Sequence, residues 1–316
     1  MSTDQIKVRV AAVAQVAPMI REFTLTAVTG SLYPFSPGSH VVVEMPGEQK
    51  IYRNAYSLLS DSHDASAYRI AVRLQDNSRG GSVFMHQQVK EGDELLISPP
   101  ANLFIPQWNA QKHILLAAGV GITPFMSYLP EMQRRQADFE LHYLFRSKQT
   151  GAYQLELAEQ LGQRFFSYDS DQAQRCNISE LLADRPLGTH IYICGPEGLI
   201  KDVQSVAEQL GWPDSVIHFE EFAAPKPGKP FTVELKSTGK TVQVGESESL
   251  LEALEEAEVA VPNLCRGGVC GQCATPVAEG EIEHRDNYLS VDEKARQDCV
   301  MPCVSRAHSD RLVLDI

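Results

Sequence analysis

Four cysteines near the C-terminus place the strongest constraint on how this 316-residue chain can fold. Cys265, Cys270 and Cys273 stand in the pattern C-x4-C-x2-C, and Cys303 follows after 29 further residues. This is the spacing with which plant-type sites hold a [2Fe–2S] cluster between four thiolates. Three glycines allow the backbone to approach the cluster sulfides and its N–H groups to tune the centre: Gly267, Gly268 and Gly271.

Two other interpretations of these cysteines are a zinc site and a set of buried thiols. Structural zinc favours two C-x2-C pairs and needs no glycines between its ligands. A spacing match of this length rarely arises by chance, so the pattern favours the iron–sulfur cluster. On spacing alone, Cys299 competes with Cys303 as the fourth ligand.

The overall charge limits the partners of the chain. Lys and Arg number 28 against 41 Asp and Glu, a formal net charge of −13. Such a surface repels phosphate backbones and anionic lipid, so we expect no nucleic acid and no membrane partner. No apolar run approaches the roughly 20 residues of a membrane helix, and the first ten residues contain no signal-peptide core. We expect a cytoplasmic protein, in which seven cysteines do not form a disulfide framework.

Residues 1–106 predict an antiparallel β domain. Short alternating runs are separated by turns rich in Pro, Gly and Asp, a pattern typical of a barrel or a sandwich. One helix is expected among them, over residues 82–89. The expected strands are Lys7–Val10, Arg21–Leu25, Ser39–Glu44, Tyr68–Arg73 and Glu94–Ser98.

Residues 107–223 change to strands that alternate with helices. This alternation indicates βαβ units on a parallel sheet, whose ligands bind at the carboxyl ends of the strands. The expected strands are His113–Ala118, Phe139–Phe145 and His190–Cys194. The expected helices end near Arg135, Leu161 and Leu210.

Residues 224–230 contain three prolines and a glycine, which predicts an extended, semi-stiff linker. Residues 231–316 then form a small β-rich module that carries the four cysteines. Its expected elements are strands at Phe231–Lys236, Thr241–Val244 and Arg311–Asp315, and a helix at Ser249–Glu256.

A glycine-rich turn follows the first strand of the expected parallel sheet. Gly119 and Gly121 precede a helix, with Thr123 expected at its N-cap and Pro124 at its first position. Such a helix start can face a pyrophosphate, although a tight strand-to-helix turn explains the glycines equally well.

A second motif, Cys194-Gly195-Pro196, ends a later strand of the same sheet. A buried structural cysteine is the more common fate of a strand thiol. Because both motifs lie at strand ends, together they favour a nucleotide site.

The last 86 residues are similar to plant-type ferredoxin domains of β-grasp fold. In its domain order, the whole chain resembles the phthalate dioxygenase reductase family. The resemblance implies a multidomain β and α/β fold: a flavin-binding antiparallel β-barrel, a Rossmann-like NAD domain and a C-terminal ferredoxin domain. Residues 53–58 and 77–82 are most similar to the reductases of carnitine monooxygenases. The Val-Ser-Arg-Ala that follows Cys303 in this family favours Cys303 as the fourth ligand.

The resemblance also implies which residues bind the flavin, expected to be FMN. Arg53, Tyr56 and Ser57 form the motif R-x-x-Y-S. Arg53 is expected to neutralise the flavin phosphate, Tyr56 to lie against the ring or ribityl chain, and Ser57 to hydrogen-bond the ring. Val72 lies in a strand that is expected to line the flavin. Phe222 is expected to pack an aromatic ring against the isoalloxazine.

A second flavin element is Arg79-Gly80-Gly81-Ser82, which precedes the expected helix of the barrel. Its glycines free backbone N–H groups for an anion. A Gly-Gly turn with Ser82 as an N-cap is the structural alternative, and the two readings are compatible.

In related reductases, the cysteine equivalent to Cys194 lies beside the nicotinamide and helps to set the geometry of hydride transfer. Arg146 and Ser147 end the strand before it and are expected to contact the adenosine ribose. Arg146 and Lys148 could also meet a 2′-phosphate, which leaves NADPH open, whereas the family favours NADH.

Together these features predict an NAD(P)H-dependent flavin iron–sulfur oxidoreductase. We expect it to be the reductase component of a two-component Rieske oxygenase, passing electrons from NADH through FMN and the [2Fe–2S] cluster. The oxygenase would act on carnitine or another quaternary amine. The alternatives are a reductase for an aromatic-acid dioxygenase or demethylase, and a redox-sensing electron-transfer module.

Overall fold

The computed structural model describes residues 5–47, 50–222 and 225–316. The expected domain end at 223 and the first expected linker residue, 224, lie outside these ranges. The chain separates into two compact units, residues 1–222 and residues 223–316. Within the described ranges, no helix combines the length and the apolar character that crossing a membrane requires.

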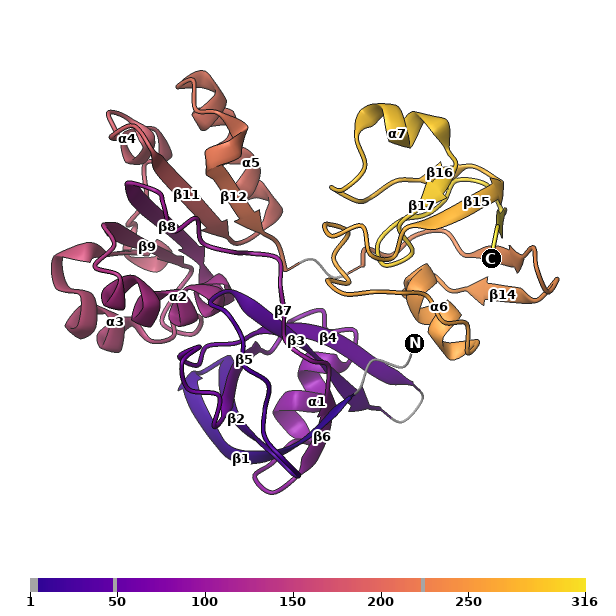
Figure 1. The fold of residues 1–316 in the computed structure, drawn as a ribbon, viewed down its shortest axis with the longest axis horizontal. Coiled ribbons are helices and arrows are strands. Elements are labelled where there is room, and N and C mark those ends of the chain that lie inside the picture. Colours follow the sequence, from indigo (N-terminus) through magenta and orange to yellow (C-terminus); the bar gives the residue numbers. More distant parts are fainter. Residues whose placement is uncertain (1–4, 48–49, 223–224) are drawn as a thin grey trace. The chain divides into compact units, whose positions relative to one another are not determined.

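The first unit starts with an antiparallel β-barrel that has an apolar interior (Figure 1). Its strand order is β4-β3-β6-β1-β2-β5, and β7 also pairs with β3. The two end strands, β4 and β5, approach each other, so the sheet is nearly closed into a barrel. The elements are β1 (Ile6–Ala17), β2 (Ile20–Ala27), β3 (Ser39–Pro46), β4 (Ile51–Ser57), β5 (Tyr68–Arg73), α1 (Gly81–Gln87), β6 (Glu94–Ile97) and β7 (Ala101–Asn102).

The second half of this unit is a five-stranded parallel sheet of order β10-β9-β8-β11-β12. From β8 the chain moves outward to β9 and β10, and from β11 it moves the other way to β12. The switch point therefore lies between the adjacent carboxyl ends of β8 and β11. The elements are β8 (Lys112–Ala118), a 3-10 turn (Gly119–Ile122), α2 (Thr123–Arg134), β9 (Phe139–Phe145), α3 (Gln154–Leu161), β10 (Phe165–Asp169), α4 (Ile178–Leu182), β11 (Thr189–Cys194), α5 (Glu197–Gln209) and β12 (Ile217–Glu220). Short 3-10 turns also occur at Gly162–Arg164, Ser170–Gln172 and Asp214–Val216.

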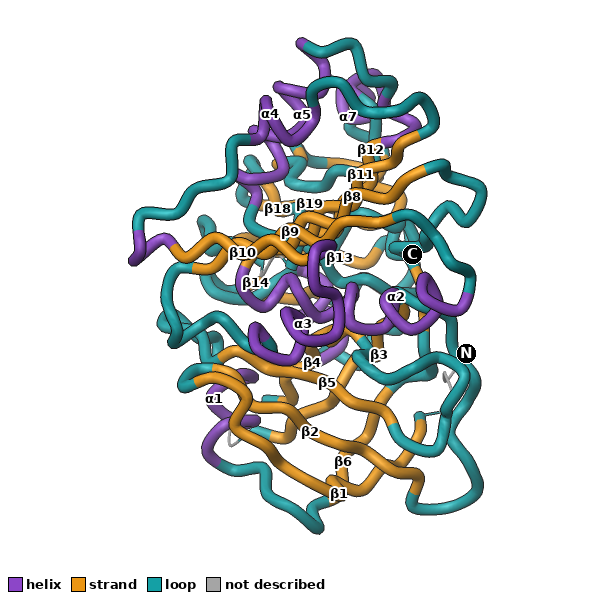
Figure 2. The backbone as a smooth tube through the Cα atoms, turned by 90° about the vertical axis from the view of Figure 1, so that its left-hand side faces the viewer, coloured by secondary structure: helices purple, strands orange, loops and turns teal. Residues whose placement is uncertain are grey.

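Helices cover both faces of this sheet. α2 and α3 pack between the sheet and the barrel in one shared core, which includes Ile20 of β2 and Phe125 of α2 (Figure 2). α4 and α5 cover the opposite face with a second apolar cluster. The barrel is thereby held against the α/β half through α2 and α3.

The second unit is a mixed sheet whose core also contains buried residues of helix α6, and it has a further short helix, α7. Its strand order is β14-β13-β19-β15-β17, with β13 and β19 parallel, and a separate pair is formed by β16 and β18. Ser249 caps α6 in a reciprocal capping box with Glu252, so the predicted helix begins one residue later than expected. The elements are β13 (Phe231–Leu235), β14 (Thr241–Val244), α6 (Leu250–Glu256), β15 (Thr275–Glu279), β16 (Ile282–Glu283), α7 (Val291–Arg296), β17 (Cys299–Val300), β18 (Arg306–Ala307) and β19 (Arg311–Leu314).

Residues 226–229, which form most of the predicted extended, semi-stiff linker, are bound to the second unit. The guanidinium of Arg306 is buried and donates hydrogen bonds to the carbonyls of Gly228 and Lys229 at 3.3 and 3.1 Å. Arg285 donates to the carbonyls of Lys226 and Pro227 at 2.6 and 3.2 Å. Residues 226–229 therefore belong structurally to the second unit.

Candidate functional site

The four predicted cluster ligands converge in the second unit. Cys265 interacts electrostatically with the thiols of Cys270 and Cys303. The sulfurs of Cys273 and Cys303 lie 3.4 Å apart. Among the described residues, Cys299 shares no hydrogen bond with these thiols; it lies in β17, opposite Pro276. The geometry thus groups the predicted four and leaves Cys299 aside.

Residues 265–273, here called the cysteine loop, are shaped to surround a group with sulfur ligands. Gly268 and Gly271 adopt left-handed backbone angles, with φ of 75° and 71°. The N–H groups of Gly267 and Gln272 donate to the sulfurs of Cys265 and Cys270 at 3.4 and 3.5 Å. Such donors stabilise thiolate ligands and tune iron–sulfur centres.

The electrostatics of the thiols favour a cation among them. Hydrogen bonds from Cys270 and Cys303 lower the pKa of Cys265, and the contact with the Cys265 thiolate raises the pKa of both donors. Without a cation, ionisation of one thiol opposes ionisation of its neighbours. Bound metal removes this conflict, because a coordinating thiol is deprotonated outright.

Cys265 interacts with Cys270 and with Cys303, and Cys303 contacts Cys273, so the four thiols, here called the thiol row, are linked pair by pair. Within the described part of the chain, no three His, Cys, Asp or Glu side chains gather as ligands of a single ion. A structural zinc ion would need four ligands around one point, whereas a binuclear cluster takes two thiolates on each iron. Four thiols at this sequence spacing supply the two thiolates per iron that a [2Fe–2S] cluster takes.

In the barrel, a buried polar atom at the end of β4 tests whether the residues there fit the expected flavin. The Ser57 hydroxyl is buried and has no hydrogen-bond partner among the described residues. Leaving a buried hydroxyl unpaired costs about 1–3 kcal/mol, which a bound polar group would recover. Nε of Arg73, at the end of β5, is also buried and unpaired. Both atoms fit the expected flavin, and sequence analysis did not select Arg73.

The register of β3 and β4 separates Arg53 from Tyr56. Residues directly opposite in an antiparallel pair point to the same face of the sheet, and neighbours alternate. Tyr56 lies opposite the buried Val41, whereas Arg53 lies opposite Glu44 and pairs with its carboxylate at 2.6 Å. The two motif residues therefore occupy opposite faces, and this geometry does not favour Arg53 as the phosphate ligand.

Asn54 shares the face of Tyr56 on β4, as does Tyr52. Its amide nitrogen donates to the Tyr56 hydroxyl at 3.2 Å and lies 2.5 Å from where a Cβ on Gly81 would stand. Burial raises the pKa of Tyr56 to about 12, so its hydroxyl stays protonated at neutral pH. The glycine turn before α1 thus packs against Asn54, which sequence analysis passed over because the motif is defined by Arg, Tyr and Ser.

The turn before α1 differs in detail from its prediction. Gly80 occupies the N-cap with φ 121°, and Ser82 is inside the helix, so the N-cap role expected for Ser82 is wrong. The Ser82 hydroxyl instead accepts the N–H of Gln75 at 3.2 Å. Arg79 is half-buried beside Gly80. Gly80 fills the cap because only glycine tolerates this backbone angle easily.

Val72 and Phe222 have contrasting environments. Val72 is buried in the barrel core, and its carbonyl is bound by the His86 ring at 2.8 Å. Phe222 follows β12 and is 44% exposed, which leaves a large aromatic face open for a ligand.

The two nucleotide motifs meet at the switch point between β8 and β11. A Cβ on Gly121 would lie 2.2 Å from the carbonyl oxygen and 3.2 Å from the sulfur of Cys194. A Cβ on Gly195 would lie 2.9 Å from Cβ of Ala118. Glycine at both positions is therefore what permits the turn after β8 to approach the end of β11.

The helix after this turn begins differently from its prediction. A 3-10 turn fills residues 119–122, so Ile122 stands at the N-cap of α2, Thr123 is the first helical residue and Pro124 the second. The Thr123 hydroxyl donates to the carbonyl of Val120 at 2.9 Å and caps no N–H group. The predicted cap and first position are therefore wrong by one residue. Pro196 occupies the N-cap of α5 and is exposed.

Cys194 is fully buried beneath the turn. Burial raises its pKa well above the ordinary thiol value, and the carboxylate of Glu220, opposite it on β12, acts in the same direction. Cys194 is therefore a neutral thiol at physiological pH. Arg146 is exposed just beyond β9, and the Ser147 hydroxyl accepts the N–H of Gln149 at 3.2 Å.

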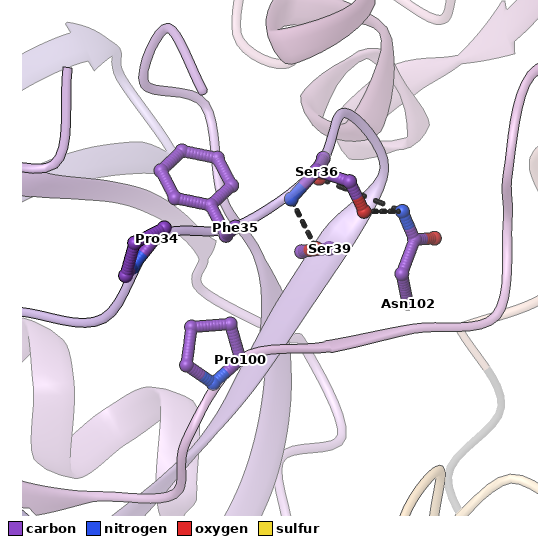
Figure 3. A pocket seen from close by; sticks show the side chains of 6 residues that line it. All are labelled: Pro34, Phe35, Ser36, Ser39, Pro100 and Asn102. Carbon is purple, nitrogen blue, oxygen red and sulfur yellow. Dashed lines mark hydrogen bonds between the residues drawn. The ribbon is translucent and has the colours of Figure 1, made fainter. Parts of the chain in front are cut away.

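The barrel also carries a pocket of about 300 Å³ between the loop before β3 and β7 (Figure 3). Asn102 fixes its rim by donating to Ser36 Oγ and to the carbonyl of Pro37, both at 2.7 Å. None of the residues predicted to bind flavin or nucleotide lines it: the lining is Pro34, Phe35, Ser36, Ser39, Pro100 and Asn102.

Comparison with known proteins agrees with this architecture. Residues 233–308 match the 2Fe-2S iron-sulfur cluster binding domain, and residues 95–217 match the dimethylamine monooxygenase subunit DmmA-like N-terminal domain. The chain is 53% identical to the heme-dependent oxidative N-demethylase beta subunit of Ectopseudomonas mendocina, over 98% of this chain and 99% of that one. It is 46% identical to the carnitine monooxygenase reductase subunit of Escherichia coli, over 96% and 97%.

Among solved structures, the chain matches phthalate dioxygenase reductase, described as a modular structure for electron transfer from pyridine nucleotides to [2Fe-2S], with a TM-score of 0.86 and 33% identity. The match covers 99% of this chain and 98% of that one. Barrel, nucleotide-type sheet and ferredoxin unit together define a single-chain flavin iron–sulfur oxidoreductase. The chain belongs to the phthalate dioxygenase reductase family, which confirms the predicted family and fold class.

Replacing Gly121 tests the contact between the two nucleotide motifs. In Gly121→Ala the new Cβ would meet the Cys194 carbonyl, so the turn must move and NADH affinity should fall at least about tenfold, or about 1.4 kcal/mol. The dissociation constant from stopped-flow flavin reduction measures the effect. Gly198→Ala, where the added methyl meets open space, is the matched control. Unchanged affinity in Gly121→Ala would separate this turn from nucleotide binding.

The opposite faces of β4 generate a second prediction. Asn54→Asp places a carboxylate beside Tyr56 and the glycine turn, so it should weaken FMN, which carries a phosphate, far more than riboflavin, which does not. Arg53→Ala should change the affinity for either flavin little, because Arg53 lies on the other face. Fluorescence titration of the flavin-free protein measures both constants. A large loss of FMN affinity in Arg53→Ala alone would reverse this assignment.

Proposed function

We propose that this chain is the reductase component of a two-component oxygenase, which passes electrons from NADH through FMN and a [2Fe–2S] cluster to the oxygenase component. The observation that carries the proposal is the row of four thiols on the same chain as a nucleotide-type switch point and an unpaired barrel hydroxyl. When bound, a flavin accepts the electron pair of a hydride and releases electrons singly, as a ferredoxin-type cluster requires.

The chain's own residues supply binding and orientation in this scheme. Gly121 and Cys194, which lie against each other, would contact the nicotinamide, and the neutral Cys194 thiol would place no charge beside it. Arg146 and Ser147, beyond the neighbouring strand β9, hold the adenosine ribose. No general acid or base is needed, because hydride transfer moves no proton through the protein.

On the flavin side, Ser57 donates its unpaired hydroxyl to the ring, and Phe222 covers an exposed ring face. Asn54, Arg79 and the Gly80–Gly81 turn face the flavin phosphate. Val72 contributes packing behind this site from the barrel core.

For the electron acceptor we propose a Rieske-type oxygenase that acts on carnitine or another quaternary amine. Plant-type clusters have potentials near −400 mV, and Rieske centres lie at about −150 to +300 mV, so the final transfer is downhill. The E. coli relative that is 46% identical is the reductase subunit of carnitine monooxygenase, which supports this substrate class.

A second acceptor is a heme-dependent N-demethylase. The relative that is 53% identical is named as the beta subunit of such an enzyme, and that similarity is the observation that favours it. Both candidates share oxidation of a substituted amine and differ in the metal centre of the partner. We place the reaction in the cytoplasm, where the seven free cysteines remain reduced.

Reconstitution with each partner distinguishes the two acceptors. The chain is mixed with the oxygenase component of carnitine monooxygenase or with the partner subunits of the heme-dependent N-demethylase, and NADH oxidation is measured with the matching substrate. The productive partner should give at least about tenfold faster, substrate-coupled turnover. Rapid NADH oxidation with cytochrome c but with neither partner would contradict both acceptors.

Removal of one cluster ligand tests the electron path. Cys270→Ser should abolish cluster absorbance and the EPR signal after dithionite, and should stop cytochrome c reduction, while NADH still reduces the flavin. Cys299→Ser is the matched control, because Cys299 stands outside the thiol row, and it should retain the cluster. Cytochrome c reduction at the full rate in Cys270→Ser would show that the electrons leave by another route.

A further inference from the structure

A second loop of the ferredoxin unit lies against the cysteine loop. This brace loop comprises residues 284–289, between the third and fourth cluster ligands in sequence. The N–H of Asn287 donates to the carbonyl of Gly268 at 3.0 Å. A Cβ on Gly268 would lie 3.2 Å from Cα of Asp286. The cysteine loop is thus in direct backbone contact with the brace loop.

Tyr288 extends this contact onto the next glycine. A Cβ on Gly271 would lie 2.2 Å from Cζ of the Tyr288 ring and 2.5 Å from the two ring carbons beside it. The ring therefore lies against the backbone of Gly271, immediately after the ligand Cys270. Tyr288 is itself 52% exposed, so one side of the ring faces the cysteine loop while much of the residue is open to solvent.

Hydrogen bonds to the carboxylate of Asp286 fix the backbone position of Tyr288. The buried carboxylate of Asp286 accepts the N–H groups of Tyr288 and Leu289 at 3.3 and 2.9 Å. It also accepts the hydroxyl of Ser305 at 3.2 Å, two residues after the ligand Cys303. Asp286 thereby links the brace loop to the segment of the fourth ligand, and the ring is held over Gly271 by both.

We propose that Tyr288 is a positioning residue that covers the Cys270 side of the cluster and, by keeping water from that ligand, holds the reduction potential low. This inference rests on the cluster of the proposed function and adds a residue to it. Solvent exposure is one of the factors that set the potential of iron–sulfur centres. A cluster gains one negative charge on reduction, and water stabilises the more highly charged form. Uncovering Cys270 therefore favours the reduced state.

The test uses the full chain with its cofactors bound. Tyr288→Ala should keep its iron and flavin content and should shift the cluster midpoint potential, followed by EPR-monitored redox titration, to a less negative value. Tyr288→Phe retains the ring and should keep the potential of the unchanged protein. Val291→Ala is a nearby control at a residue that is 84% exposed, and it should also leave the potential unchanged.

A potential unchanged in fully loaded Tyr288→Ala would overturn the proposal. If this variant does not retain its cluster, Tyr288→Leu decides the matter, because a smaller apolar side chain uncovers only part of Gly271. It should shift the potential in the same direction by less, and an unchanged value would again reject the shielding role. Absence of a cluster EPR signal from the dithionite-reduced, unaltered chain would instead reject the cluster and with it the proposed function.

Discussion

Bringing four thiols into contact within one small fold is the constraint on which the rest of the second unit depends. Hydrogen bonds lower the pKa of Cys265 and raise the pKa of its neighbours, so the thiols cannot all ionise together without a cation. The left-handed glycines, the inward N–H groups and the brace loop are all arranged around this cluster of sulfurs. The β-grasp sheet holds the cysteine loop close to Cys303, which follows Cys273 after 29 further residues of the same unit.

The first unit depends on a close approach between two backbone segments, the turn after β8 and the end of β11. At the switch point, Gly121 allows the turn after β8 to lie against Cys194, and α2 and α3 pack this sheet onto the barrel through a common core. The unpaired Ser57 hydroxyl and the switch point belong to the same compact unit. The first unit thus carries the features expected to bind the two-electron donor and the flavin, and the second unit carries the four thiols.

The sequence was informative where chemistry imposes spacing or period. The cysteine pattern identified the four thiols that converge, and the strands at Tyr68–Arg73 and Phe139–Phe145 were predicted at their observed bounds. β15 was missed because Pro276 interrupts its pattern, and β10 because it has little alternation in five residues.

The caps at Thr123 and Ser82 were misplaced because a 3-10 turn and a left-handed glycine take those positions. The separation of Arg53 from Tyr56 depends on strand register, and the contact of Tyr288 with Gly271 joins distant segments, so neither was visible in the sequence.

Arg306 and Arg285 bind residues 226–229, and this has a consequence for how fast electrons can move between the units. Only five residues, 221–225, remain between the end of β12 and the first strapped residue. The six Cα–Cα steps from residue 220 to residue 226 span at most about 22 Å. A tether this short keeps the donor and the acceptor at an effective concentration in the millimolar range or above, so their encounter rate is independent of how dilute the protein is in the cell.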